Sequence, residues 1–353
     1  MAHPLLEQAQ QQGTPIIDGE RVTFVWQGDA PAPLLAGDFN NWADDGMPIQ
    51  LDRIAPGVWA HTLTLRPDAY IEYAYLIDVD KETRVPDPFN TRTIWNGVGD
   101  FNHFFHMPQA PRENPDARRK PNIPRGTVTR LRLEQAWMLV GGKRALRLYR
   151  PPVEEPTPLL IVLDGADYFN RAAIVPIVDN LIAEGRIRPI ALALIENSPS
   201  GRFIEYAASE ATLGLLLDVV LPFAAEHLPL IDVRAEPGIH GVLGASMGGL
   251  MALYAGLRAP HVFGHIASQS GAFRIQPERP FVVYDLARHL PPPDLRLWLD
   301  CGLYERLLGG NREMAALLSE RGSAFAYHEY SGGHNYPCWS LVLPRALETI
   351  YGA

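Results

Sequence analysis

A Gly-x-Ser-x-Gly motif directly after a mainly apolar run constrains the fold of this chain more than any other stretch. The run Ile239–Leu243 precedes Gly244-Ala245-Ser246-Met247-Gly248, and small, helix-compatible residues follow. This order predicts a strand, a sharp turn and a helix, with strained backbone angles at Ser246. Such a motif also occurs by chance in ordinary turns. The strand before it and the helix after it favour a nucleophilic serine raised at the positive end of a helix.

The chain has 353 residues, which is long for one domain and suits two. Short β-branched and aromatic runs separated by turn residues fill the N-terminal third, and they predict a small all-β, immunoglobulin-like sandwich over residues 1–107. A Pro-rich basic stretch without periodicity over residues 108–126 is typical of a semi-stiff linker. Residues 127–353 form the second predicted domain.

The second domain alternates strands with helices. Residues 159–164 and 189–195 are continuous apolar runs, as expected for buried parallel strands. Between and after them, residues 174–182 and about 210–227 carry helical spacing. The pattern predicts an α/β-hydrolase fold with a doubly wound, mostly parallel sheet. Ligands of such sheets bind beyond the carboxyl ends of the strands.

A nucleophilic serine needs a base, and His334 is the candidate. It follows the last predicted strand and stands after Ser246 in chain order, as α/β-hydrolases require. Gly332 and Gly333 precede it and give a loop that can turn the imidazole toward the serine. The alternative is an ordinary surface histidine.

The acid that orients the base is expected after the penultimate strand, where two carboxylates compete. Asp300 ends that strand and Glu305 lies deeper in the loop. We predict Glu305, because it can reach over the sheet, whereas Asp300 can serve as a cap of the turn. A Ser-His dyad without an acid and a surface pair of Glu305 with Arg306 remain open.

The oxyanion formed during acyl transfer needs two backbone N–H donors. Met247, directly after the nucleophile, is predicted to supply one. The second is predicted on the loop after the strand that ends at Asp164, from Ala166 or from Gly165.

Composition excludes several other functions. The net charge of −9 argues against a broad nucleic-acid surface. The sequence has no Cys/His spacing typical of zinc, and acyl transfer by serine needs no metal or organic cofactor, so we predict none. No apolar stretch predicts a membrane span and the first residues do not resemble a signal peptide. Two cysteines, Cys301 and Cys338, suit a reducing compartment such as the cytoplasm. We predict no oligomeric state.

The second domain resembles the esterase-D-like α/β-hydrolases, and within them the enterochelin (enterobactin) esterases. The sandwich is similar to their N-terminal early-set domain. The matching stretches are Leu163-Asp164-Gly165, Val178–Arg186, Arg202 with Glu205-Tyr206, Gly244–Gly249, Ser268–Gly271 and Gly332–His334.

This resemblance implies a serine esterase that opens the trilactone of a catecholate siderophore, with or without bound iron, in the cytoplasm. It implies Ser246 as nucleophile and His334 as base. It places Arg202 near the anionic catecholate end, against the alternative of a structural pair with Glu205. Tyr168 and Trp339 complete the predicted substrate-binding residues. Asn335 departs from the family, which usually has an acidic residue after the histidine.

The same fold family contains feruloyl and acetyl-xylan esterases, which give the alternative function. Their acid lies in a Cys-Gly-x-x-Asp-x-Leu stretch, and Cys301-Gly302-Leu303-Tyr304-Glu305 matches it with Glu for Asp. The stretch Gly37–Trp42 resembles a signature of sandwich domains attached to glycan-active enzymes. That signature would indicate a sugar site, but we favour Phe39 and Trp42 as core residues of the sandwich. A third reading is a carbohydrate-binding protein with an inactive hydrolase domain.

Overall fold

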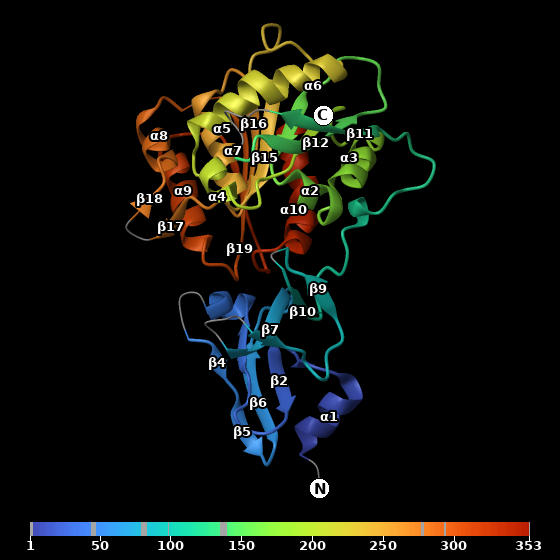
Figure 1. The fold of residues 1–353 in the computed structure, drawn as a ribbon, viewed down its shortest axis with the longest axis vertical. Helices are drawn as coiled ribbons and strands as arrows, with labels where there is room; N and C mark the ends of the chain where they lie inside the picture. Colours follow the sequence, from blue (N-terminus) through green and yellow to red (C-terminus); the bar gives the residue numbers. More distant parts are fainter. Residues whose placement is uncertain are drawn as a thin grey trace. The chain divides into compact units, whose positions relative to one another are not determined.

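The computed structural model describes residues 3–43, 47–78, 83–97, 99–134, 140–276, 279–292 and 294–352. The chain divides into two compact units, and each is discontinuous in sequence (Figure 1). The first unit contains Met1–Arg112 together with Gly302–Arg306 and Tyr330–Cys338, and the second contains the rest. Two segments of the first unit therefore lie more than 180 residues after its main part, within the stretch that the sequence predicts as the second domain.

The first unit contains two antiparallel sheets and an N-terminal helix, α1 (Pro4–Gln12). One sheet has the order β1 (Ile16–Asp18), β2 (Arg21–Gln27), β6 (Val58–Thr64) and β5 (Asp52–Ala55). The other has the order β4 (Ile49–Gln50), β3 (Leu34–Gly37), β7 (Tyr70–Asp78), β10 (Phe101–His106) and β9 (Thr93–Trp95), with β8 (Thr83–Val85) paired to β7.

The two sheets share one apolar core. Phe24 on β2 and Tyr73 on β7 are fully buried, and their ring centroids lie 5.0 Å apart in an edge arrangement. Phe39, in the 3₁₀ segment η1 (Asp38–Ala43), packs on Phe24 with centroids 5.5 Å apart. The interpretation of Phe39 as a core residue is therefore confirmed, since this partly buried ring packs on the apolar core that both sheets share.

The second unit is built on an eight-stranded sheet. Its order is β11 (Thr127–Glu134), β12 (Lys143–Arg150), β14 (Ala191–Ile195), β13 (Leu159–Val162), β15 (His240–Ala245), β16 (Phe263–Gln269), β19 (Arg296–Gly302) and β20 (Ala326–Tyr330). The pairs from β14 to β19 are parallel, whereas β11 and β12 are antiparallel to their neighbours. The central strands are buried on both faces, which explains their continuous apolar sequences.

Helices cover both faces of this sheet (Figure 1). On one face, α4 (Arg202–Tyr206), α7 (Met247–Arg258), α8 (Val283–His289) and α9 (Leu308–Glu320) contact one another in series. The long helix expected near residues 210–227 is α5 (Glu210–Leu215), a π turn η3 (Leu216–Val220) and α6 (Leu221–His227). The remaining elements are α2 (Gly165–Asn170), α3 (Ile174–Ala183), α10 (Tyr336–Tyr351), η2 (Pro115–Ala117), β17 (Arg274–Gln276) and β18 (Arg279–Pro280).

The stretch predicted as a linker is held by the second unit from residue 113 on. Asn180 on α3 donates from Nδ2 to the carbonyl oxygens of Asp116 and Arg118, each at 2.7 Å. Asn114 is bound to the backbone of Ser340 on α10. These bonds fix the segment, because buried backbone groups need partners.

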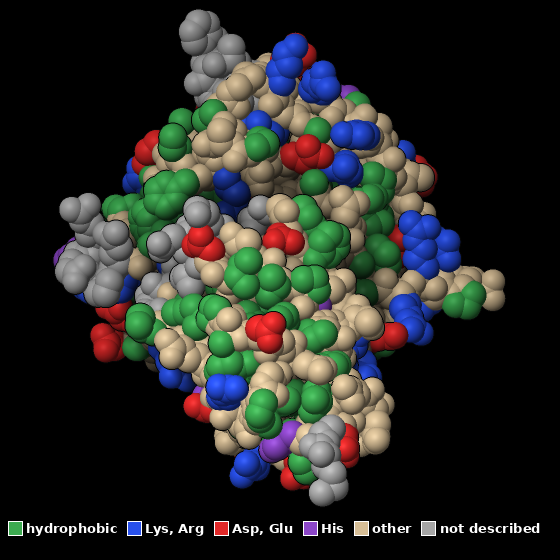
Figure 2. All heavy atoms as spheres, turned by 60° about the horizontal axis from the view of Figure 1, so that its bottom comes forward, with side chains coloured by type: hydrophobic (Ala, Val, Ile, Leu, Met, Phe, Trp, Pro, Cys, Tyr) green, Lys and Arg blue, Asp and Glu red, His purple; other side chains and the backbone are tan. Residues whose placement is uncertain are grey.

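Basic, acidic and apolar side chains are mixed on the face of the molecule that Figure 2 draws. Among the described residues, no helix combines the length and the apolar character needed to cross a bilayer.

Candidate active site

Ser246 occupies the sharp turn that its motif predicts. β15 ends at Ala245, α7 begins at Met247, and Ser246 between them has φ 59° and ψ −122°. A positive φ at a residue with a side chain is strained, and strain of this kind concentrates at functional sites. The turn is fixed from two sides, because Ser246 donates its N–H to Gln269 O (2.8 Å) and accepts from Ala272 N (3.0 Å).

Gly244 is needed because the backbone folds back on itself in this turn. A Cβ at Gly244 would lie 2.4 Å from the backbone carbon and oxygen of Gly248. No side chain fits there, so the first turn of α7 closes tightly on the end of β15.

The predicted oxyanion donors lie at the starts of two helices that follow neighbouring strands. β13 pairs directly with β15 in parallel, so the turn at Gly165 and the turn at Ser246 leave the same edge of the sheet. Gly165 and Ala166 open α2, and Met247 opens α7. The first N–H groups of a helix have no acceptor inside it, which makes both turns suited to bind an oxyanion.

Arg202 is held beside these two turns by a buried carboxylate. Its Nε and Nη2 donate to Asp164 at 2.8 and 2.7 Å, and Nη2 also reaches Ala245 O at 3.3 Å. Asn197 binds the same carboxylate at 2.5 Å. The alternative partner considered for Arg202 is wrong, because Glu205 instead pairs with Arg144 at 2.5 Å. Arg202 therefore ties the turn that follows β13 to the turn that holds Ser246, a role that only the contacts disclose.

His334 and Glu305 come together in the first unit. His334 Nδ1 lies 2.6 Å from Glu305 Oε2. Oε1 of the same carboxylate accepts from Gly302 N–H (2.6 Å) and from the Tyr330 hydroxyl (3.2 Å). The Glu305 side chain is 2% exposed, whereas that of His334 is 35% exposed. This is the arrangement of a buried acid that orients a partly accessible imidazole.

Asp300, the competing acid, is engaged elsewhere. It is fully buried at the end of β19, where Oδ2 accepts from Trp298 Nε1 (2.7 Å) and Gln269 Nε2 (3.2 Å). Of the two carboxylates left open by the sequence, the structure thus pairs Glu305 with the histidine.

Comparison with known proteins adds the family. The model of the family described as "Putative esterase" matches residues 139–350. The chain belongs to this esterase family. It is 27% identical to the iron(III) enterobactin esterase of Escherichia coli strain K12 over 76% of this chain and 67% of that protein. It is 26% identical to the iron(III) enterobactin esterase of Dickeya dadantii over 94% of this chain and 89% of that protein.

The solved structures agree on the fold. The crystal structure of the ferric enterobactin esterase from Salmonella typhimurium superposes with a TM-score of 0.77 at 24% identity, covering 94% of this chain and 93% of that one. The fold is thus an α/β-hydrolase type with an additional β domain. The prediction of an enterochelin esterase-like carboxylic ester hydrolase is confirmed at the level of the family.

Two of the predicted substrate-binding residues of this esterase lie in its interior. Tyr168 is fully buried and donates to Gln269 Oε1 at 2.9 Å. Trp339 is 4% exposed and donates from Nε1 to Ser270 Oγ at 2.9 Å. Both hydrogen bonds are made to residues at or just after the end of β16. The two buried side chains therefore stabilise this strand end and do not form a substrate-binding surface. Their size and position in sequence did not reveal their burial.

Asn335 has a structural use in this esterase. Its Oδ1 accepts from Cys338 N–H at 3.0 Å and so caps the start of α10 directly after His334. The two cysteines, Cys301 and Cys338, are buried thiols. Burial and the nearby carboxylates of Asp38, Glu72 and Glu305 raise the pKa of Cys338 well above its usual value, so it is a poor nucleophile.

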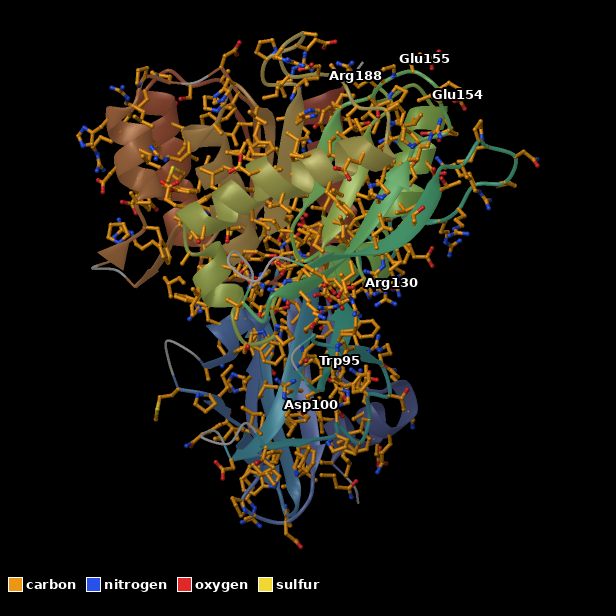
Figure 3. The ribbon with its side chains drawn as sticks, turned by 45° about the horizontal axis from the view of Figure 1, so that its top comes forward. Trp95, Asp100, Arg130, Glu154, Glu155 and Arg188 are labelled. Atoms are coloured by element: carbon orange, nitrogen blue, oxygen red, sulfur yellow. The ribbon has the colours of Figure 1, made fainter. Side chains whose placement is uncertain are left out.

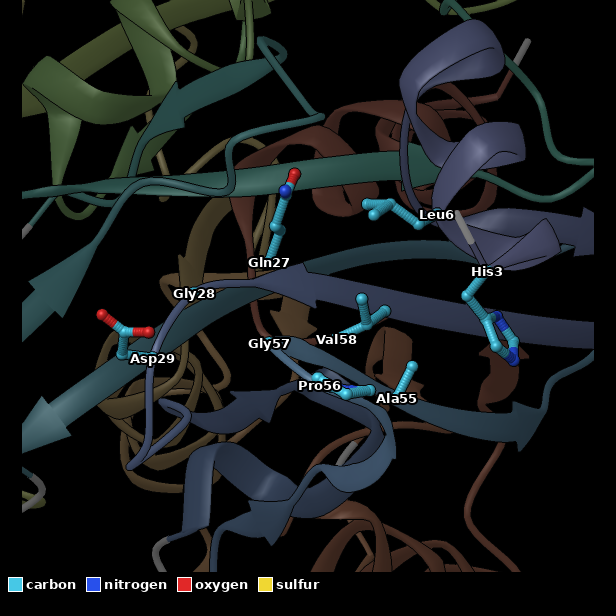
Figure 4. A pocket seen from close by; sticks show the side chains of 9 residues that line it. All are labelled: His3, Leu6, Gln27, Gly28, Asp29, Ala55, Pro56, Gly57 and Val58. Atoms are coloured by element: carbon cyan, nitrogen blue, oxygen red, sulfur yellow. The ribbon is translucent and has the colours of Figure 1, made fainter. Parts of the chain in front are cut away.

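Other features of this esterase do not add a site. An open pocket in the first unit lies between the start of α1 and the β5–β6 turn (Figure 4). Its lining includes only two ionisable side chains, His3 and Asp29, and none of the predicted catalytic residues. Among the described residues, no three His, Cys, Asp or Glu side chains are grouped so that they could hold a metal ion.

Proposed function

We propose that this chain is a serine esterase that hydrolyses the ester bonds of a catecholate siderophore of the enterochelin type. Ser246 is the nucleophile, His334 the base and Glu305 the acid. The observation that carries the proposal is the backbone of Ser246, strained at φ 59° between β15 and the first turn of α7. A strained turn between a strand and a helix is how a nucleophilic serine is raised from the end of a strand.

Chain order and sheet topology support the triad. β15 and β19 run parallel to the intervening β16, so Ser246 and the loop that holds Glu305 both follow carboxyl ends of strands. The pair of His334 with Glu305 at 2.6 Å supplies an oriented base. The order nucleophile, acid, base along the chain is that of α/β-hydrolases.

The proposed reaction is acyl transfer in two steps. The Ser246 hydroxyl attacks the ester carbonyl while His334 Nε2 takes its proton, and Met247 N–H together with Ala166 or Gly165 N–H stabilises the oxyanion. The tetrahedral intermediate collapses, and His334 returns the proton to the departing alcohol. Water then attacks the acyl-serine with His334 again as base, which releases the acid and restores the hydroxyl.

The proposed substrate class is taken from two relatives that are named iron(III) enterobactin esterases. They match 76% and 94% of this chain. Iron in such a substrate is cargo of the siderophore. Arg202 pairs with Asp164 but keeps 32% of its side chain exposed, and the proposal places that exposed part near the anionic catecholate.

A hydrolysis panel tests both levels of this proposal. The full chain is assayed with ferric and iron-free enterobactin, methyl ferulate and p-nitrophenyl acetate. We expect kcat/KM on a trilactone at least about 10-fold above that on methyl ferulate. We expect Ser246→Ala to lose about 10³-fold or more on every substrate, because the nucleophile is removed.

The outcomes separate substrate from mechanism. A preference for methyl ferulate that still depends on Ser246 would replace the siderophore with a feruloyl ester. Full activity of Ser246→Ala would end the serine mechanism. No labelling of Ser246 by a fluorophosphonate in the wild-type chain would favour the carbohydrate-binding alternative.

A further inference from the structure

The sandwich motif Gly37–Trp42 has a buried acid that the proposed reaction does not use. Asp38 follows β3 and is 3% exposed. Its Oδ1 accepts from Trp42 Nε1 at 2.9 Å, and its Oδ2 accepts from Glu72 N–H on β7 at 2.8 Å. Both oxygens are therefore held in one orientation by the sandwich.

The fixed carboxylate of Asp38 lies against the backbone next to the proposed base. A Cβ on Gly333 would lie 2.1 Å from Asp38 Cγ and 2.2 and 2.4 Å from its two oxygens. No residue with a side chain fits at position 333 in this conformation. The residue before His334 thus packs directly on Asp38.

Further bonds join both loops of the proposed acid and base to the sandwich. Tyr70 N–H donates to Ser331 O (3.0 Å), and Arg66 Nε donates to Ser331 Oγ (2.7 Å). The Tyr304 hydroxyl accepts from Arg66 N–H at 3.0 Å. Tyr304 N–H in turn donates to Gly332 O at 3.1 Å. These contacts lie within the first compact unit. They hold the two loops against the sandwich and against each other.

We propose that Asp38 is a positioning residue for His334, an inference that rests on the proposed serine-esterase function. The carboxyl group of Asp38 packs against the backbone of Gly333. This contact fixes the backbone before His334 and therefore the direction in which its imidazole points. Asp38 touches neither substrate nor the reacting atoms. The glycan-type motif of the sandwich therefore serves the catalytic loop of this chain.

The electrostatics of the cluster agree with this role. Burial, followed by the negative charge of Glu72 and a smaller contribution from Glu305, raises the pKa of Asp38 well above its usual value. A carboxyl that keeps its proton to higher pH can lie beside two other acids without adding a third negative charge.

The surroundings of Asp38 and Trp42 do not suit a sugar. Sugar-binding modules stack an exposed aromatic face on the ring, but the guanidinium of Arg84 lies 5.3 Å from the Trp42 ring centroid. Arg84 is kept there by Asp100 of the β9–β10 hairpin, whose Oδ2 lies 3.6 Å from Arg84 Nε. Figure 3 labels Asp100 on this hairpin. The carboxylate itself is buried, so it offers no hydrogen bond to a glycan.

The test compares Asp38→Ala and Asp38→Asn with Asp87→Asn in the full chain. Asp87 is the matched control, because it is a buried aspartate of the same sandwich whose hydrogen bonds go to Thr14, Tyr73 and Phe89. Two measurements are made on each folded variant. One is kcat and KM on p-nitrophenyl acetate, and the other is the low-field proton resonance of the His334 Nδ1–H bond to Glu305, assigned with His334→Gln.

We expect Asp38→Ala to lower kcat by about 10- to 100-fold with KM changed less than about threefold, since misplacement of a catalytic group by about 1 Å has effects of this size. Asp38→Asn keeps the shape and is expected to lose less. Both should shift or broaden the His334 resonance, whereas Asp87→Asn should change neither kcat nor the resonance.

The results distinguish this inference from the proposed function. Asp38 variants that fold with the wild-type resonance and kcat would overturn the positioning role, as would an equal loss in Asp87→Asn. Loss of binding to xylo-oligosaccharides in Asp38→Ala with kcat unchanged would overturn it in favour of a sugar site. If the wild-type chain hydrolyses no ester, the proposed function fails, and a resonance shifted only by Asp38 variants still supports the positioning of His334.

Discussion

The surroundings of the two acidic candidates of the site, Glu305 and Asp300, separate their roles. Glu305 accepts from Gly302 N–H and lies 2.6 Å from His334 Nδ1, so one oxygen fixes the carboxylate and the other orients the imidazole. Asp300 accepts instead from Trp298 and Gln269 inside the sheet. The first arrangement stabilises an imidazolium, and the second stabilises the end of a strand.

Glu305→Gln therefore should lower kcat by about 10²- to 10⁴-fold, because an amide N–H facing Nδ1 favours the wrong tautomer of His334. The matched control is Asp300→Asn, which we expect to destabilise the fold by about 1–3 kcal/mol while kcat stays within about threefold. Steady-state kinetics and urea unfolding of both variants check this. Reversed effects on kcat would assign the acid to Asp300.

At the scale of elements, the site depends on two strand-turn-helix units that leave the same sheet edge. β15 with α7 holds Ser246, and β13 with α2 holds the turn proposed to give the second oxyanion donor. Close packing shapes both turns, since a Cβ at Gly165 would lie 2.4 Å from the backbone carbonyl carbon of Leu194. Strand order brings these helix starts together, so their N–H groups converge on one region.

Gly244→Ala should be strongly destabilising, because the added methyl would meet the backbone of Gly248 at 2.4 Å and neither segment can move aside. We expect a loss of about 1–3 kcal/mol or more, together with reduced fluorophosphonate labelling as Ser246 shifts. Gly309→Ala, in α9 with nothing within 4 Å of the new methyl, should be neutral or stabilise by up to about 1 kcal/mol. Equal urea midpoints for the two variants would refute the packing argument.

At the scale of the whole molecule, the proposed catalytic residues are divided between two compact units. Ser246 and the oxyanion turns belong to the second unit, whereas Glu305 and His334 belong to the first. The segments that carry Glu305 and His334 follow strands of the second unit in the chain. Under the proposed function, loss of folding in either unit removes a proposed catalytic residue, so the stability of each unit bears on activity.

Acid should destabilise the whole fold through His240 on β15. Burial, followed by repulsion from His265, lowers the pKa of His240 to about 4. An unfolded histidine titrates near 6.5, so between these values the unfolded chain binds more protons and stability falls as pH falls. For His240 alone the loss is about 3 kcal/mol by pH 4.

His240→Asn isolates this effect, because the amide oxygen can accept the Leu159 N–H that now donates to His240 Nδ1 at 3.0 Å. Urea midpoints at pH 7, 5.5 and 4.5 should fall less steeply in the variant than in the wild type. The remaining slope belongs in part to His265, whose pKa burial also lowers to about 4. Parallel curves would show that His240 does not control the acid transition.

Sequence by itself determined the sharp turn at Ser246, the class of fold and the family, and it supplied His334 as the candidate base. Residues contiguous in the sequence predict these features. The glycines around Ser246 predict the turn, and apolar runs of strand length predict the strands of the sheet. Tertiary structure alone decided the rest, including the pairing of Glu305 with His334, the tie of Arg202 to Asp164, the burial of Tyr168 and Trp339, and the packing of Asp38 beneath Gly333. Each of these depends on which side chains meet after the chain has folded, and partners tens to hundreds of residues apart leave no local pattern in one sequence.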